Sequence, residues 1–428
     1  MSRPFDVVIF GATGFTGQYV VQEFAKQNSQ NLRWAVAGRS KEKLKNILQQ
    51  TSDELGKDYS GIDVIVADVK DGESLNAMCS QAKLVLNCVG PYRFFGEPVV
   101  KACVENGCHH LDVSGEPEFL ETMQFKYHEK AKESKIFVVG TCGFDSIPAD
   151  MGIVYTQKKF PGQLCHVESF LSVTSGDKGM QGHYGTYQSI IYGIASEKEG
   201  NLKRLRKQLF PNPMPRAGPK LKMRGPIFYG KEVDKWSLPF PGADPSVVRR
   251  TQRYRNDVLK KPPIQYSAYF TIPSIIYVAM FLMFGFIFML LASFEYGRKL
   301  LEKYPKIFSF GLFSHEGPTR EQMDGTSFHM TFYGKGFSKD YQGDITAESK
   351  MDKKIVTRVV GPELAYIATP ICMVQAALVI LNERESMPES GGVLTPGAAF
   401  AETKLIERLD KAGVKFLTVE EPNAIAKE

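Results

Sequence analysis

The stretch Phe5–Gly17, which reads FDVVIFGATGFTG, decides the fold of this chain. Its run VVIF is typical of a strand that is buried on both faces. Three glycines follow at a spacing of three, Gly11, Gly14 and Gly17, and apolar residues then recur at helical spacing. A strand, a glycine-rich turn and a helix in this order form a dinucleotide-binding fingerprint, because the turn lets phosphates approach the N–H groups at the helix N-terminus.

Apolar runs and helical patterns alternate after this stretch. Further strands are predicted over 32–38, 62–68, 84–89, 110–113 and 136–140. This rhythm predicts an α/β fold, with a doubly wound parallel sheet of Rossmann type over residues 1–160. A second, α+β domain is expected over 161–365, and helices that return to the core over 366–428.

The end of the second predicted strand indicates the cofactor. NAD-binding folds usually place a carboxylate here for the ribose 2′-hydroxyl. This chain has Arg39 and Ser40, which suit a 2′-phosphate, so NADP(H) is preferred over NAD(H). The alternative is that Arg39 is only a surface residue at a helix start. The residues expected to bind the cofactor are Gly11, Thr13, Gly14, Phe15, Thr16, Gly17, Arg39, Ser40, Asp68, Val69, Cys88, Val89 and Gly90.

Reduction of a carbonyl or enoyl group also needs a proton donor. The proton-bearing side chains at the carboxyl ends of the predicted strands are Tyr92, Ser114, Glu116, Asp145 and Ser146. Tyr92 and Asp145 are the preferred catalytic pair. The alternative is that both only position the cofactor or shape the loops.

Cysteine usage indicates reduced thiols and no metal centre. The chain has seven cysteines among 428 residues. Cys103, Cys108, His109 and His110 lie close together, but their spacing matches no zinc pattern, so core packing is expected.

Several motifs together resemble the saccharopine dehydrogenase superfamily. They are GATGFTG, AGRS, NCVGPY, LDVSGE, GFDSIPAD and GGVLTP, in that order along the chain. The sequence most closely resembles animal saccharopine dehydrogenase-like oxidoreductases and is similar to bacterial trans-acting enoyl reductases. This resemblance implies an NADP-type reductase fold with an inserted second domain. It also implies that residues 326–333, 354–360 and the GGVLTP stretch belong to that second domain.

A basic, proline-rich block covers residues 200–261. It contains 16 Lys or Arg and four Asp or Glu, and it is expected to be an extended, irregular loop. Such a block suits nucleic acid, anionic lipid or an acidic partner, or it is simply a solvated loop.

The sequence after the block favours lipid over nucleic acid. The segment 266–294 contains SIIYVAMFLMFGFIFMLLAS, 20 uncharged residues with basic flanks. As a helix it would be about 30 Å long, and membrane association is preferred over a buried core helix. A full span would divide the second domain across the bilayer. We therefore expect a monotopic anchor, bent at Pro273 or Gly285, with the basic block against anionic head groups.

A second uncharged run predicts a core helix. From Pro370 to Glu383 this helix would be only about 21 Å long, too short to span a membrane.

The combined expectation is an NADP(H)-dependent oxidoreductase at a lipid droplet or another cytosol-facing membrane, such as the endoplasmic reticulum. Its substrate would be a hydrophobic or lipid-linked carbonyl or enoyl compound, and a homodimer is also considered. One alternative is a catalytically inactive nucleotide-binding scaffold at a lipid surface, since no Y-x-x-x-K motif lies beside the fourth strand. The other is a saccharopine dehydrogenase in lysine metabolism.

Overall fold

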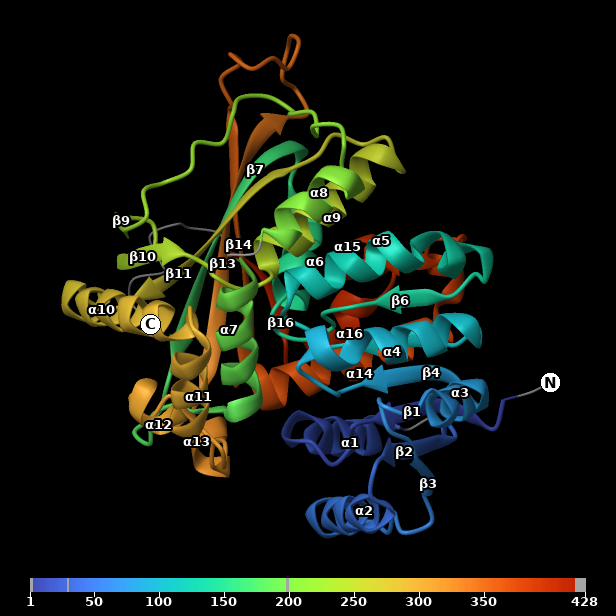
Figure 1. Ribbon diagram of the computed structural model, residues 1–428. Helices are drawn as coiled ribbons and strands as arrows, with labels where there is room; N and C mark the ends of the chain where they lie inside the picture. Colours follow the sequence, from blue (N-terminus) through green and yellow to red (C-terminus); the bar gives the residue numbers. More distant parts are fainter. Residues whose placement is uncertain (1–2, 29–30, 198–199, 420–428) are drawn as a thin grey trace.

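Two seven-stranded sheets organise the chain (Figure 1). The structure, a computed structural model, describes residues 3–28, 31–197 and 200–419. Residues 420–428, the end of the predicted C-terminal segment, lie outside the described residues.

The first sheet is parallel throughout, as the sequence predicts. Its strands, in spatial order, are β15 (Gly392–Leu394), β6 (Phe137–Val139), β5 (His109–Asp112), β4 (Ala82–Asn87), β1 (Phe5–Phe10), β2 (Trp34–Gly38) and β3 (Asp63–Val66). The helices between them are α1 (Phe15–Gln27), α2 (Lys41–Leu55), α3 (Gly72–Gln81), α4 (Tyr92–Glu105) and α5 (Pro117–Glu133). The predicted Rossmann-type α/β fold is confirmed.

Strand β1 is buried on both faces. Val7 and Ile9 belong to a core shared with α1 and α2, whereas Val8 and Phe10 face a second core built with α3 and α4. Successive side chains of a strand point to opposite faces, so the all-apolar run is needed to fill both cores.

One expectation about this sheet is wrong. The GGVLTP stretch was expected in the second domain, but it forms β15, which pairs with β6 in parallel at the edge of the first sheet. Glycines fit here because a Cβ on Gly391 would lie 2.4 Å from the Ile136 carbonyl oxygen.

The second sheet is mixed and has the long strand β7 (Gly162–Thr174) at its centre. Its order is β16 (Lys415–Val419), β14 (Lys353–Pro362), β13 (Ser327–Ser338), β7, β11 (Gln265–Ile272), β10 (Lys235–Pro239) and β9 (Phe228–Gly230). The helices α6 (Ile147–Lys159), α9 (Asp244–Asp257) and α15 (Pro396–Phe400) contact one another between the two sheets.

The basic block is more ordered than the sequence predicts. It contains α8 (Asn201–Leu209), β9, β10 and α9. Arg206 forms an ion pair with buried Glu121 at 2.7 Å, and Arg224 pairs with Glu168 and Glu232 at 2.8 Å. The expectation of an irregular loop is therefore wrong for much of the block, because these cations stabilise internal structure.

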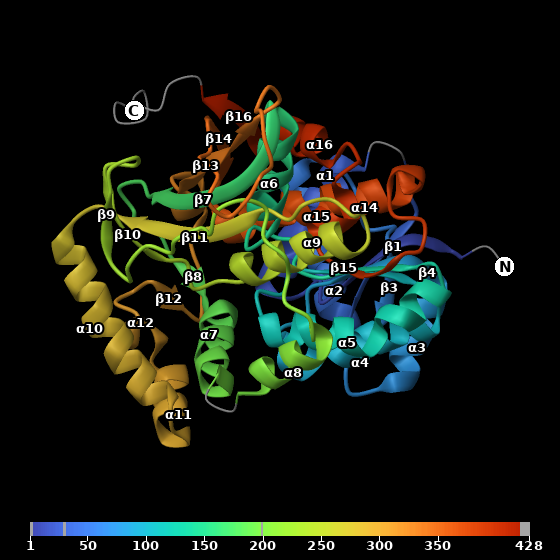
Figure 2. The ribbon, with the colours of Figure 1, turned by 90° about the horizontal axis from the view of Figure 1, so that it is seen from above.

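The segment 275–312, which we call the apolar segment, leaves the second sheet after β11 and returns before β13. It contains α10 (Ile275–Ala292), α11 (Glu295–Lys303) and α12 (Pro305–Phe308). Helix α10 runs unbroken through Gly285, so no bend lies there. Both views place α10 at the side of the molecule away from the first sheet (Figures 1 and 2).

Two helical stretches of the described chain are long and apolar enough to cross a membrane. In the 18-residue apolar stretch of α10, 11% is buried, whereas 78% of the corresponding stretch within Leu364–Asn382 is buried. The latter combines a π-helical turn, Leu364–Ala368, with α14 (Thr369–Asn382), which packs against α1. The predicted core helix is confirmed.

We expect Gly17→Ala to destabilise the protein by about 1–3 kcal/mol, because a Cβ at Gly17 would lie 2.1 Å from the Gly11 carbonyl oxygen. Gly193→Ala is the matched control. It lies in α7 (Tyr184–Glu197) with nothing within 4 Å of a new Cβ, so it should stabilise by about 0.5–1 kcal/mol. Urea denaturation of both variants measures this. Equal stability of the two variants would contradict the close packing of α1 on β1.

Candidate functional site

The glycine-rich turn has the geometry that phosphate binding needs. Gly11 has a φ of +81°, and a Cβ there would lie 2.7 Å from the Val89 side chain. The N–H of Gly11 donates to the Ala37 carbonyl at 2.9 Å, and the N–H of Gly14 donates to the Gly11 carbonyl at 2.9 Å. These bonds hold the turn against the end of β2.

The N-terminus of α1 can accept an anion. Its N-cap, Gly14, makes no side-chain capping bond, and the first turn has no acidic residue. The first N–H groups of a helix have no intrahelical acceptor, so those of Phe15, Thr16 and Gly17 can donate to a pyrophosphate. Thr13 and Gly14 are exposed beside them.

Phe15 contributes to the predicted site only through its backbone. Its ring stacks on His183 at 4.6 Å and meets Tyr366 edge-on at 4.8 Å. His183 lies in the short strand β8 (Gly182–His183), and its N–H donates to the Tyr366 hydroxyl at 2.7 Å. The aromatic side chain therefore joins the cofactor turn to the second domain.

Arg39 and Ser40 fit a 2′-phosphate. Arg39 is exposed, and it has no hydrogen bond or ion pair within the described part of the chain. The Ser40 side chain caps α2 by accepting from the Lys43 N–H at 3.3 Å, which leaves its hydroxyl proton free to donate.

Asp68 and Val69 shape the loop after β3. The Asp68 carboxylate accepts from the Lys70 N–H at 3.0 Å, and its carbonyl accepts from the Asp71 N–H at 2.9 Å. Val69 packs against the second core of the first sheet.

The loop after β4 forms the floor of the predicted nicotinamide side. The Cys88 N–H donates to the Phe10 carbonyl at 2.8 Å, and the Val89 N–H donates to the Asn87 side chain at 3.0 Å. Burial raises the pKa of Cys88 to about 12, so this thiol stays protonated. The Gly90–Pro91 peptide is cis and leads into α4.

Tyr92 is not placed as a proton donor. It is buried, its hydroxyl donates to the Asn87 carbonyl at 2.8 Å, and it accepts from the Val113 N–H at 3.3 Å. Burial and then the Asp112 carboxyl raise the pKa of Tyr92 well above its usual value. In this structure Tyr92 therefore ties the end of β4 to the end of β5, and its role in catalysis stays a prediction.

Three other predicted proton donors, Glu116, Ser114 and Ser146, form hydrogen bonds that stabilise the loops. Glu116 accepts from the N–H groups of Tyr92 and Arg93 at 2.9 and 3.2 Å, and from the Arg93 guanidinium at 2.9 Å. Ser114 and Ser146 are fully buried and bonded to neighbouring loop atoms. All three side chains are buried.

The other preferred catalytic residue is Asp145, whose carboxyl group has a raised pKa. It follows β6, and its carboxylate accepts from the Ala243 N–H at 3.1 Å. Burial raises the pKa of Asp145 to about 7. A Cβ on Gly115, after β5, would lie 2.6 Å from this carboxylate, so Asp145 reaches over the carboxyl end of β5.

Three titratable groups near this end of the sheet were missed from the sequence. Asp112 is buried at the end of β5, and burial raises its pKa to about 7. Asp244 and Tyr266 come from α9 and β11 of the second domain. Asp112 could have been found because it ends a predicted strand, whereas the other two carry no local signal.

The thiols and imidazoles considered for a metal lie in the core. Cys103 contacts Cys79 at 3.6 Å, and His109 accepts from the Phe137 N–H at 2.9 Å. Within residues 3–28, 31–197 and 200–419 there is no group of three or more His, Cys, Asp or Glu that could hold a metal ion.

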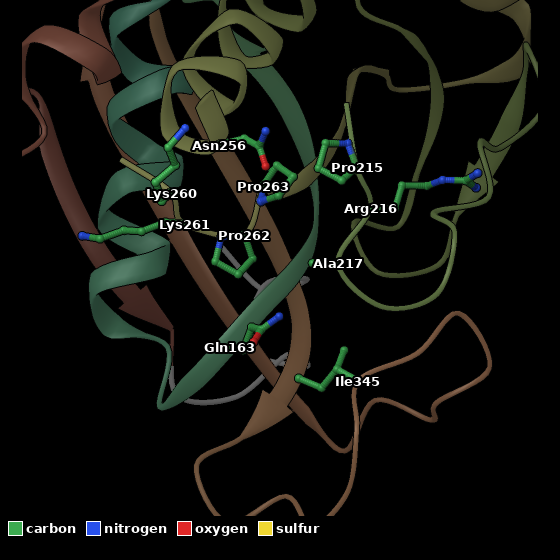
Figure 3. A pocket seen from close by; sticks show the side chains of 10 residues that line it. All are labelled: Gln163, Pro215, Arg216, Ala217, Asn256, Lys260, Lys261, Pro262, Pro263 and Ile345. Carbon is green, nitrogen blue, oxygen red and sulfur yellow. The ribbon is translucent and has the colours of Figure 1, made fainter. Parts of the chain in front are cut away.

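A surface cavity of about 570 Å³ lies elsewhere, where β7 begins (Figure 3). Its rim carries Arg216, Lys260 and Lys261, and no acidic residue lines it. None of its lining residues belongs to the glycine-rich turn, so it is separate from the cofactor site.

Comparison with known proteins identifies the first domain. Residues 7–139 match the family model described as the saccharopine dehydrogenase NADP binding domain. This stretch contains the glycine-rich turn and Arg39, which identifies the first domain as an NADP-binding domain.

Relatives match along nearly the whole chain. The human saccharopine dehydrogenase-like oxidoreductase is 50% identical over 424 residues, which cover 97% of this chain and 98% of the relative. The lipid droplet localized protein of Caenorhabditis elegans is 40% identical, with 97% and 98% covered. The trans-acting enoyl reductase of Mycobacterium bovis is 30% identical over 59% of this chain and 55% of its own length.

A solved structure has the same overall fold. Saccharopine dehydrogenase (L-Glu forming) from Saccharomyces cerevisiae superposes with a TM-score of 0.56 at 12% identity, covering 97% of this chain and 100% of the other. With the glycine-rich turn, the NADP-binding domain and full-length identity of 50%, the chain belongs to the family of saccharopine dehydrogenase-like oxidoreductases.

Proposed function

We propose that this protein is an NADP(H)-dependent oxidoreductase that works at a lipid surface on a hydrophobic or lipid-linked carbonyl or enoyl substrate. The observation that carries the proposal is that one helix, α7, contacts both the apolar segment and the loop of the cofactor site. Bound NADPH would supply the hydride, and the chain would hold it, exclude water and provide a proton.

The exposed face of α10 suits lipid. Ile276 is 70% exposed and Phe286 is 66% exposed, and most other large residues of this helix are also exposed. Soluble surfaces rarely carry a contiguous apolar patch of this kind. Beyond α10, the apolar segment adds exposed side chains at Tyr296, Tyr304, Ile307, Phe310 and Leu312.

The charges around the apolar segment suit an anionic lipid layer. Arg298, Lys299, Lys303 and Lys306 follow α10 within 14 residues of its end, against Glu295 and Glu302. Basic side chains beside an apolar face add attraction to anionic head groups, at about 1 kcal/mol each near the surface. Two exposed tyrosines, Tyr296 and Tyr304, have the amphipathic character of side chains at such an interface.

The way in which the apolar segment is attached to the second sheet favours monotopic membrane association, in which the segment enters one lipid layer without crossing the membrane. Strand β11 precedes it and β13 follows it, and both pair with β7 in the same sheet. A helix whose two ends belong to one folded body can lie in one lipid layer without dividing that body. The name of the worm relative agrees with this location.

Helix α7 joins this face to the cofactor crevice. On one side, Tyr187 packs against Phe288 of α10 at 5.4 Å. On the other side, the Ser189 hydroxyl donates to Glu116 at 3.2 Å, and Glu116 holds the backbone of Tyr92. Figure 2 shows α7 between α10 and α4. Helix α7 therefore connects the face of the apolar segment with the loop after β5.

We expect Arg39→Ala to weaken NADPH binding by about tenfold or more and to leave NADH binding nearly unchanged. The reason is the loss of a charge-assisted hydrogen bond, worth about 1.5–3 kcal/mol, to the 2′-phosphate. Isothermal titration calorimetry measures both nucleotides. Lys45→Ala, which removes an exposed cation on the same helix α2, is the control and should change neither affinity. Equal losses for both nucleotides in Arg39→Ala would contradict this role.

We expect the double variant Ile276→Glu and Phe286→Glu to lower partition onto lipid by about a hundredfold or more, because each buried apolar side chain contributes about 1.5–3 kcal/mol. Flotation with triolein droplets coated with phosphatidylcholine and phosphatidylserine measures this. Both residues are exposed, so the melting temperature should not change.

The control is Met223→Glu, which charges an exposed residue outside the apolar segment and should still float. If the unmodified protein instead dimerises through α10 in the absence of lipid, and the double variant is monomeric, a second copy covers this face and the lipid assignment fails. Lipid binding without turnover on any carbonyl or enoyl compound would favour the inactive scaffold.

A further inference from the structure

Three residues outside the first sheet enclose the ring of Phe15, the first residue of α1. His183 stacks on this ring with centroids 4.6 Å apart and planes at 11°, and Tyr366 meets it edge-on at 4.8 Å. A Cβ on Gly317 would lie 2.5 Å from the ring, so a larger residue there would displace it. We call His183, Tyr366 and Gly317 the Phe15 cage.

Hydrogen bonds hold the members of the Phe15 cage in place. The N–H of His183 donates to the Tyr366 hydroxyl at 2.7 Å. The Nδ1 atom of His183 accepts from the Gly185 N–H at 3.1 Å, which sets the orientation of the imidazole ring. The N–H of Gly317 donates to the Ser314 hydroxyl oxygen at 2.9 Å. The cage is therefore an ordered receptor for the ring.

The Phe15 cage orders the backbone that would bind the cofactor. The N–H of Phe15 is one of the first in α1, where the pyrophosphate is expected. Gly14 precedes it, and glycine leaves the backbone many accessible conformations. The fixed ring of Phe15 restricts those conformations from the other side. A site whose donors are already in place binds more tightly, because less ordering has to occur on binding.

The cage is directly connected to the apolar segment. The segment ends at Leu312, and the short strand β12 (Phe313–Ser314) follows it. Strand β12 pairs in parallel with β8, with Ser314 opposite His183. The N–H of Gly182, the neighbour of His183, donates to the Leu312 carbonyl at 2.7 Å. The end of the apolar segment is thus bonded to the strand that carries the stacking ring.

Helix α7 makes a second connection between the same two parts. Its residue Tyr187 contacts Phe288 of α10 at 5.4 Å and Phe313 of β12 at 5.2 Å between ring centroids. Tyr187 is buried in one cluster with Ala292 of α10 and Leu301 of α11. The seat of β12 therefore includes side chains that are in place only when α10 and α11 are packed against α7.

Lipid would favour this packed arrangement. Most large side chains of α10 are exposed, so in water the segment gains little from the few contacts that attach it to α7. A lipid layer that covers the exposed face stabilises the arrangement to which it binds. The packed segment also supports β12 and, through β8, the ring of His183. Lipid at α10 and a nucleotide at the glycine-rich turn thus favour the same state of the protein.

We propose that His183 and Tyr366 are positioning residues for the cofactor turn, and that through them lipid bound to the apolar segment strengthens NADP(H) binding. This inference rests on the proposed function, which supplies the lipid surface. Linkage makes the effect reciprocal, so bound NADPH strengthens lipid binding by the same factor. The protein would carry its cofactor more fully at the lipid surface than in water.

The first test compares NADPH affinity with and without lipid. Isothermal titration calorimetry of the unmodified protein should show at least about fivefold tighter binding in the presence of phosphatidylcholine and phosphatidylserine vesicles. The double variant Ile276→Glu and Phe286→Glu is the control, and vesicles should not change its affinity. Equal affinities in the unmodified protein, under conditions where vesicles and NADPH both bind, would overturn the coupling and leave the proposed function intact.

Two substitutions of His183 separate stacking from the hydrogen bond at the start of α7. His183→Asn keeps an acceptor for the Gly185 N–H but removes the ring, whereas His183→Phe keeps the ring and removes the acceptor. His183→Asn should lose about threefold to tenfold in NADPH affinity, as expected for one aromatic pair, and lose the lipid effect. His183→Phe should keep both.

The kinetic readout of these variants distinguishes positioning from catalysis. In His183→Asn the KM for NADPH should rise while kcat is unchanged, because His183 orders the cofactor turn and takes no part in the reaction. A loss of affinity in His183→Phe as large as that in His183→Asn would mean that the residue only caps α7. Such a result would reject the positioning role.

The reciprocal effect can be measured without lipid. Trypsin cleaves after exposed lysines, and Lys299 and Lys303 lie in α11 of the apolar segment. Saturating NADPH should slow cleavage there by about fivefold in the unmodified protein, but not in His183→Asn. Cleavage after exposed Lys350, outside the segment, is the internal control and should not change. Unchanged cleavage of α11 with NADPH bound would overturn the proposal. Failure of NADPH to bind any form would reject the proposed function together with this inference.

Discussion

A single buried carboxylate joins elements of the two domains at their interface. Asp150 lies in the first turns of α6, and its Oδ2 atom accepts from Thr251 of α9 and from Gly397 of α15. A Cβ on Gly397 would lie 2.8 Å from the carboxylate, so only glycine allows this approach. Because α6 follows the first sheet and α9 belongs to the second domain, the bond to Thr251 ties the two domains together at this point.

A second contact couples the cofactor turn to the same interface. Phe15 begins the helix whose N–H groups would hold the pyrophosphate, yet its ring stacks on His183 and meets Tyr366. The helix that would bind the cofactor therefore also contacts the second domain through the Phe15 ring. Two contacts therefore join the domains: the stacking of the Phe15 ring and the hydrogen bonds of Asp150.

Much of the first domain could be predicted because its signals are local. The run VVIF, the three glycines and Arg39 each depend on neighbouring residues only, and the structure places them together. Strand β15 could not be predicted in this sheet, since its partner β6 lies about 250 residues earlier and three residues carry no pattern of their own.

The hydrogen bonds of the predicted catalytic residues could not be predicted from residue type, because their partners are backbone groups of other loops. Tyr92 has the right residue type at the right strand end, but its hydroxyl is fully used by the Asn87 carbonyl and the Val113 N–H. Asp244 was overlooked for the opposite reason. It is an acid inside a basic block, and only the packing of α9 against α6 buries it near the interface of the two domains.

The route of the chain through the apolar segment has a consequence for local stability. Strands β11, β7 and β13 keep all their pairings whether or not α10 is formed, because the segment is only the connection between β11 and β13. Few of its side chains are buried, with Val278 and Ala292 as its main anchors in α10. In water, the amide hydrogens of α10 can therefore exchange through local opening of this one helix, whereas those of β7 exchange only when the whole second sheet unfolds.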